Sequence, residues 1–307
     1  MQDIEKNILR VICYYDIFNY PLTQFEIFQK IDVKTVLGDV LIALDNIGPK
    51  IVGKKNGFYY LAGRENLVSI RSKRYNYTLR KIKRAKLIAH IFEYIPYIKL
   101  VAIGNLIGAH NLKNEGDIDL FIVTEVGAIW TTRFITATLM KLLGLRPKKN
   151  NQKDKICLSF FVTENALNLT QFAINKNDIY LNYWLSSLYP IYDKNDTYNK
   201  LINQNKWIFS RLPNWIKIEA NPKYSIKKIN NDTSIKNKFF NSIENILHNI
   251  QLKILPTEIT NNFINNSNVG VVVNSEVLKF HTKDKRLEYY ELYLEKWNTL
   301  KKNHFVI

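Results

Sequence analysis

The sequence predicts an α+β protein of more than one domain, with short helices and a hairpin first, a mixed β-sheet with flanking helices next, and a mostly helical C-terminal region. Three observations support this prediction. The 307 residues exceed the usual length of a single domain. Hydrophobic residues make up 46% and charged residues 23%, a globular composition that excludes general disorder. Stretches with helical and with strand-like hydrophobic spacing alternate along the chain.

Residues 1–63 predict three short helices followed by a β-hairpin. Thr23 is placed to cap the second helix, and residues 34–46 form the third. The hairpin turn is Asn56-Gly57, the strongest short-range hairpin signal, between two β-prone runs. This order of elements resembles a winged helix. Its third helix carries two aspartates and a single lysine, which favours docking to protein over reading DNA.

Residues 64–97 predict a linking helix that is rich in lysine and arginine. Such a run is most often a solvated face. Because it precedes the motif described next, a basic wall beside a phosphate site is the alternative. The net charge of +17 fits a polyanionic partner and a biased amino-acid composition equally well. A nucleic-acid partner, bound through the winged helix or the linking helix, therefore stays open.

The next part, residues 98–190, carries the residues with the clearest chemistry. An apolar strand reaches Gly104 and Asn105, and a second strand starts with Asp117 and Asp119, whose side chains share one face. Two adjacent carboxylates repel each other unless a cation lies between them. Mg²⁺ prefers carboxylate and phosphate oxygens, and a glycine turn offers backbone N–H groups to phosphate. The sequence therefore predicts a site for Mg²⁺, or Mn²⁺ in its place, beside a phosphate-binding turn.

The strand, the glycine turn and the Asp-Ile-Asp motif together resemble the DNA polymerase β-like nucleotidyltransferase superfamily. The resemblance covers about residues 100–162, and more loosely the whole chain resembles bacterial members with an N-terminal winged helix. It implies that Gly104 and Asn105 contact a nucleoside triphosphate and that Asp117 and Asp119 hold the metal. The implied reaction is transfer of a nucleoside monophosphate to an acceptor hydroxyl, which the sequence does not identify.

The superfamily typically places a third carboxylate on a later strand, predicted here at residues 156–162. That strand contains no acid, and Ser159 stands where the carboxylate is expected. The nearest acids are Asp154, Glu164 and Asp178. If one of these three acids lies beside Asp117 and Asp119, the interpretation of the protein as an enzyme is favoured. Its absence would favour the alternative, a catalytically impaired nucleotide-binding protein or a winged-helix adaptor for nucleic acid or protein.

Residues 191–307 predict a mostly helical region that also contains one short strand pair. The resemblance implies that this region shapes the acceptor site. Residues 221–237 are polar and predict a loop. His281, Asp284 and Arg286 are expected to form a polar network at the surface, with a helix cap, and not a catalytic group.

Several other functions are excluded or disfavoured. His110, between the two strands of the motif, is expected to be inert, and Cys157 to pack in the core. Two cysteines exclude a disulfide framework and a four-thiolate zinc site. The five histidines lack the spacing of a zinc hydrolase. No stretch is apolar enough to span a bilayer and no secretory signal is visible, so a cytoplasmic protein without membrane association is expected.

Overall fold

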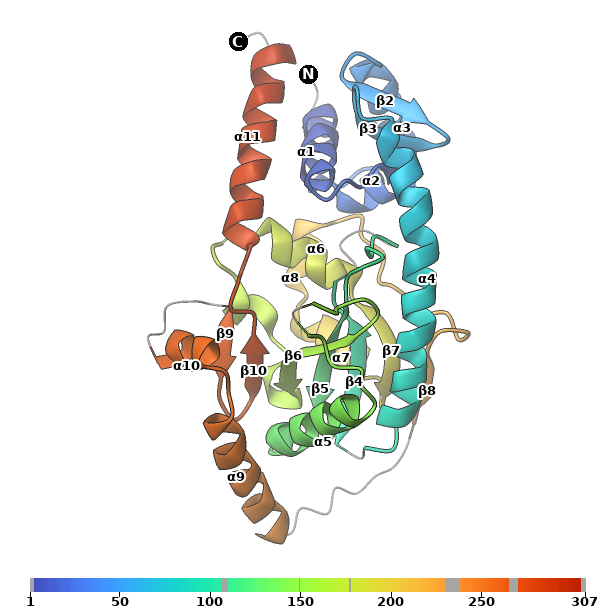
Figure 1. Ribbon diagram of the computed structural model, residues 1–307. Coiled ribbons are helices and arrows are strands. Elements are labelled where there is room, and N and C mark those ends of the chain that lie inside the picture. The colour runs from blue at the N-terminus through green and yellow to red at the C-terminus, as the bar shows by residue number, and fades with distance from the viewer. Residues whose placement is uncertain are drawn as a thin grey trace.

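The computed structural model describes residues 3–95, 97–105, 110–148, 150–176, 178–229, 238–264 and 270–304. It is a mixed α/β protein in which helices surround a seven-stranded mixed sheet, and a smaller three-stranded sheet lies near the N-terminus (Figure 1). None of the helices in these ranges combines the length and the apolarity that crossing a bilayer requires.

The N-terminal unit consists of α1 (Asp3–Ile17), β1 (Leu22–Thr23), α2 (Gln24–Lys30), α3 (Leu37–Ile47), β2 (Val52–Lys55) and β3 (Phe58–Leu61). The three predicted helices and the hairpin are confirmed. Thr23 caps α2 as expected: its Oγ1 accepts the N–H of Glu26 at 3.2 Å, and the Glu26 carboxylate accepts the N–H of Thr23 at 2.8 Å. This reciprocal capping box satisfies two backbone donors that the helix start would otherwise leave unpaired.

The predicted linking helix is α4 (Asn66–Phe92), which runs from the N-terminal unit along the side of the large sheet (Figure 1). Several of its basic residues contact other parts of the chain. Arg71 pairs with Glu26 of α2 at 2.7 Å, and Arg74 donates to a backbone carbonyl just after α1. Lys81 pairs with Asp154 at 2.8 Å. These residues brace α4 against both parts of the molecule, a role different from the expected solvated face or phosphate-binding wall.

The large sheet has the strand order β8-β7-β4-β5-β6-β10-β9. Its strands are β4 (Ile98–Ile103), β5 (Ile118–Thr124), β6 (Ile156–Thr163), β7 (Tyr189–Lys194), β8 (Ile226–Lys228), β9 (Val271–Val273) and β10 (Val277–Phe280). β5 pairs with β6, and β7 with β8, in parallel, whereas the other neighbours are antiparallel. The predicted strands of the motif and the late strand pair are confirmed. The boundary expected at residue 190 falls within β7, so strands from both sides of it build one sheet.

Helices cover both faces of this sheet. The helices that follow β5 along the chain are α5 (Ile129–Leu142), α6 (Ile179–Ser187), α7 (Thr197–Gln204), α8 (Trp207–Arg211), α9 (Lys238–Lys253), α10 (Thr257–Ile264) and α11 (Arg286–His304), with short 3₁₀ turns at Glu164–Ala166 and Leu169–Phe172. Ile118 and Leu120 of β5 face the core shared with α4 and α5, whereas Phe121 and Val123 face α6, α7, α8 and the N-terminal unit. α11 runs beside α1 (Figure 1).

The loop predicted for residues 221–237 is wrong in part. Ile226–Lys228 forms β8, which pairs in parallel with β7 at the edge of the sheet. Only one of its three residues is apolar, so the strand gains its order from backbone pairing with β7 and not from a hydrophobic pattern of its own. Residues 230–237 lie outside the described residues.

Candidate functional site

The two predicted acids lie together at the start of β5. One carboxylate oxygen of Asp117, one of Asp119 and the Sγ of Cys157 all lie within 4.8 Å of one another. Cys157 reaches the pair because β6 runs parallel to β5 and places it opposite Asp119. Within the described ranges no other set of three His, Cys, Asp or Glu side chains comes this close. The expectation that the two acids share one side of the strand is confirmed.

Both carboxyl groups are electrostatically unfavourable in the metal-free protein. Burial raises the pKa of Asp119, and the neighbouring charge of Asp117 raises it further. Hydrogen bonds from Cys157 and Asn105 lower this pKa, but by less. Burial also raises the pKa of Asp117, whereas a backbone hydrogen bond and the charge of Lys81 lower it by less. Two partly buried acids that repel each other do not stabilise a fold. A divalent cation between them would relieve the repulsion.

Gly104 and Asn105 follow β4 and lie beside the acids. The N–H of Gly104 donates to the carbonyl of Asp119 at 2.9 Å, so this donor is already used within the protein. A Cβ at Gly104 would stand 3.4 Å from the Trp184 ring, which leaves little room for a side chain. Asn105 Nδ2 donates to the carbonyl of Asp117 at 3.2 Å. These two residues therefore hold the geometry of the acid pair as well as lining the space beside it.

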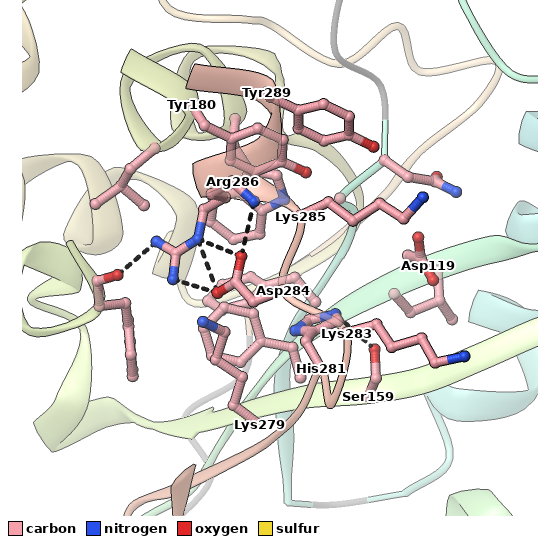
Figure 2. Close-up of a pocket in the computed structure, with 18 residues that line it drawn as sticks. Asp119, Ser159, Tyr180, Lys279, His281, Lys283, Asp284, Lys285, Arg286 and Tyr289 are labelled. Atoms are coloured by element: carbon pink, nitrogen blue, oxygen red, sulfur yellow. Dashed lines mark hydrogen bonds and ion pairs between the residues drawn. The ribbon is translucent and has the colours of Figure 1, made fainter. Parts of the chain in front are cut away.

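A cavity of about 220 Å³ opens next to Asp119 (Figure 2). Gly104, Asn105 and Asp119 form one side of it, and aromatic residues of α6 and α11 form another. The opposite wall comes from the segment between β10 and α11. Figure 2 shows the side chains of Lys283 and Lys285 extending from this wall toward the side where Asp119 lies. The cavity thus places two exposed lysine side chains across from Asp119, the inner member of the acid pair.

Sequence reasoning did not find this basic wall. Four basic residues fall within eight positions, at Lys279, Lys283, Lys285 and Arg286, and that local density was the available signal. A charged run is usually a solvated face, so the pattern alone does not separate a site from a surface. It becomes a wall because β10 pairs antiparallel with β6, the strand next to β5, and so brings the segment to the same side of the cavity as β6.

The polar network expected at His281, Asp284 and Arg286 exists only in part. Arg286 is buried and donates to Asp284, to Asp178 at 2.8 Å and to the carbonyl of Phe172 at 2.6 Å. Burial alone would raise the pKa of Asp284, but the hydrogen bonds and charge of Arg286 hold it below its usual value. The network is therefore a buried support of the cavity wall, and its expected place at the surface is wrong.

The bend in β6 explains where Ser159 and Cys157 lie. Asp119 pairs with Cys157 and Phe121 with Phe160, so β6 has one residue more than β5 over this stretch. Such a bulge re-aims side chains. Cys157, and not Ser159, stands beside the acid pair, and it is only partly buried, so its expected core role is wrong. Ser159 Oγ lies 3.0 Å from the Nε2 of His281.

None of the three candidate acids joins the pair. Asp154 pairs with Lys81 at 2.8 Å, Glu164 faces a lysine of α7 at 3.8 Å, and Asp178 pairs with an arginine of α11 at 2.8 Å. Asp178 also caps α6 by accepting the N–H of Leu181 at 2.9 Å. The third carboxylate that the resemblance implies is therefore not supplied by Asp154, Glu164 or Asp178.

His110 does not reach the acid-pair cavity. It lines a second cavity of about 430 Å³ between the N-terminal unit, α4 and the segment after α8, with its ring 4.7 Å from that of Tyr75. Burial lowers the pKa of His110, with a further contribution from Arg71. His110 therefore lies apart from the cavity beside Asp119.

Lys81 anchors the turn that leads into Asp117. Its buried ammonium group pairs with Asp154 and donates to the carbonyl of Gly116. We expect Lys81→Met to lower the free energy of unfolding by about 3 kcal/mol, because it breaks a buried ion pair. Nucleotide affinity should fall as well, because Gly116 positions Asp117. Denaturant unfolding and nucleotide titration measure the two effects, and the exposed Lys83→Met should change neither.

Comparisons with known proteins add no relative to this geometry. Protein-family models, curated proteins and solved structures give no match to the chain. The resemblance to the nucleotidyltransferase superfamily therefore rests on the residues named above, and the structure establishes a mixed α/β protein with a mixed sheet.

Proposed function

We propose that the chain binds a nucleoside triphosphate together with a divalent cation and transfers its nucleoside monophosphate to an acceptor hydroxyl. The observation that carries this proposal is the placement of the Asp119 carboxylate, with that of Asp117 next to it, at one side of a cavity that has Lys283 and Lys285 on the opposite wall. A cation bridges carboxylates to phosphate oxygens, and lysines compensate the remaining phosphate charge.

The architecture supports the same proposal. A mixed sheet with β4 antiparallel and β6 parallel to β5 is consistent with a nucleotidyltransferase-type domain. The three N-terminal helices with the sheet order β1-β3-β2 are consistent with a winged helix. Fold alone does not define an activity, so the argument for function stays with the site.

In this arrangement Asp117 and Asp119 would hold the cation, which would supply charge neutralisation for the phosphate oxygens. The acceptor oxygen forms a bond to the α-phosphorus and its proton passes to the solvent, while the bond from that phosphorus to the bridging oxygen breaks and pyrophosphate leaves. Rings of Tyr180, Trp184 and Tyr289 line the cavity, so a base that enters it would contact aromatic side chains. Catalysis is then mainly positioning and charge compensation.

A second candidate function is nucleotide binding without turnover, as in an adaptor. It is favoured by the absence of Asp154, Glu164 and Asp178 from the acid pair, since a carboxylate is a far better general base than a hydroxyl or thiol at that place. In such an adaptor the N-terminal unit would contact the partner.

The start of α3 is an unsuitable surface for reading DNA. Asn214 Nδ2 donates to the carbonyl of Val33 at 2.7 Å, and the N–H of Thr35 donates to Asn214 Oδ1 at 3.2 Å. Recognition helices contact base edges with their N-terminal residues. Because the chain itself lies against this end of α3, a protein partner for the N-terminal unit is the better-supported form of the adaptor function.

The test incubates the protein with α-labelled nucleoside triphosphates and Mg²⁺ or Mn²⁺, and measures binding by equilibrium dialysis and release of pyrophosphate. Wild type is compared with Asp117→Ala/Asp119→Ala, and with Asp39→Ala/Asp45→Ala, which removes two exposed acids of α3. Binding with release, lost only in the first variant, supports transfer. Binding without release supports the adaptor. Binding that survives in the first variant contradicts both.

A further inference from the structure

The third group beside the acid pair is a thiol, where the resemblance leads one to expect a carboxylate. The Sγ of Cys157 lies within 4.8 Å of the oxygens of Asp117 and Asp119. It also forms a side-chain hydrogen bond with Asp119, which orients the thiol toward the carboxylates. The register between β5 and β6 places it there.

This donor set suits magnesium poorly. Mg²⁺ takes oxygen ligands in near-ideal octahedral geometry, and a thiolate is not among them. Zinc-class cations accept thiolate and carboxylate together, with bonds of about 2.0–2.3 Å. Donor atoms around a tetrahedral zinc ion then lie roughly 3.5 Å apart. Side chains whose ligand atoms already lie within 4.8 Å reach that spacing by small rotations.

A second observation at the same place points to a bound cation. The Oδ1 of Asn105 is buried and has no hydrogen-bond partner. Its amide nitrogen donates to the carbonyl of Asp117, and the side chain also hydrogen-bonds to Asp119, so the planar amide lies against the pair. A buried carbonyl oxygen without a partner is unfavourable by about 1–3 kcal/mol. A rotation of the amide that turns this oxygen toward the acids would let a cation there satisfy it, and would bring the number of protein donors to the usual four of zinc.

We propose that Asp117, Asp119 and Cys157 bind a thiophilic divalent cation of the zinc class in preference to Mg²⁺, with Asn105 completing the set. Binding releases the thiol proton to the solvent, because the thiolate is the ligand. The inference rests on the proposed function for the role of this cation toward the nucleotide phosphates. The preference for the cation itself stands on the donor set alone.

The test titrates the full-length, reduced, metal-free protein with Co²⁺ and follows the near-ultraviolet charge-transfer absorption of a cobalt–thiolate bond. We expect the absorption to saturate at one equivalent of Co²⁺ and to be displaced by an equivalent of Zn²⁺ but not by a large excess of Mg²⁺. Cys157→Ser should remove the absorption and lower Zn²⁺ affinity by about 100-fold. Cys157→Asp should remove it and raise Mg²⁺ affinity. Cys13→Ala, which deletes the buried thiol of α1, should retain it.

Two outcomes overturn the inference in distinguishable ways. If Mg²⁺ or Mn²⁺ binds wild type but Co²⁺ gives no thiolate absorption, or if the absorption persists in Cys157→Ser, the thiol is not a ligand and the proposed function still stands. If no divalent cation of either class binds, with or without adenosine triphosphate present, the inference and the proposed function both fail.

Discussion

Asp119→Asn should abolish cation-dependent nucleotide turnover while making the metal-free protein more stable. Loss of a carboxylate that holds the cation removes several kcal/mol of stabilisation from the transition state, so we expect turnover to fall at least about 10³-fold. The same change removes a partly buried charge that Asp117 repels. We therefore expect the free energy of unfolding to rise by about 1–2 kcal/mol. If Asp119 instead served to stabilise the fold, Asp119→Asn would lower the free energy of unfolding.

The pH dependence of stability checks the cause. In wild type the pKa of Asp119 is raised by burial and by Asp117, so the folded state holds this proton more tightly than the unfolded state. Stability of the metal-free protein should then fall as pH rises from about 4 through the raised pKa. In Asp119→Asn this slope should be smaller. Urea unfolding in a chelator, with Asp45→Asn of the exposed α3 face as control, measures it. A variant less stable than wild type at pH 7 would contradict the argument.

The acid pair and the N-terminal elements could be predicted because their signals are local. Asp117 and Asp119 share one side of β5 through simple alternation along a strand. Thr23 caps α2 with a partner three residues away. Neither feature depends on which strand or helix lies beside it. Local patterns of this kind can therefore be predicted from the sequence without knowledge of the tertiary structure.

The rest of the site depends on register and on pairing between distant segments. Whether Cys157 or Ser159 faces the acids is decided by one extra residue in β6, which alternation alone does not reveal. Lys283 and Lys285 face the pair only because β10 joins the sheet next to β6. Three basic residues of α4, Arg71, Arg74 and Lys81, brace the fold through acidic and carbonyl partners that lie far away in sequence. Cys157 and the lysine wall are therefore positioned by pairing between segments that are distant in sequence, which local sequence patterns do not reveal.

Arg286 supports the wall opposite the acids, and its loss should destabilise that wall. Arg286 donates to both oxygens of Asp284, to Asp178 at 2.8 Å and to a backbone carbonyl, and its side chain is only 7% exposed. We expect Arg286→Met to lower the free energy of unfolding by about 3–5 kcal/mol, because two carboxylates lose their counter-charge inside the protein. Nucleotide affinity should fall with it, since Lys285 directly precedes this residue.

The contribution of Arg286 has a defined pH dependence. Its charge and hydrogen bonds depress the pKa of Asp284 below the unfolded value, so the stabilisation is present above that value and is lost as pH falls through the folded pKa. The difference in unfolding free energy between wild type and Arg286→Met should therefore be largest near pH 7 and shrink below about pH 4. Adding Asp284→Asn to Arg286→Met should recover part of the loss, because it removes one of the stranded charges. A constant difference across pH, or no recovery in the double variant, would mean that Arg286 stabilises the wall by packing and not by its ion pairs.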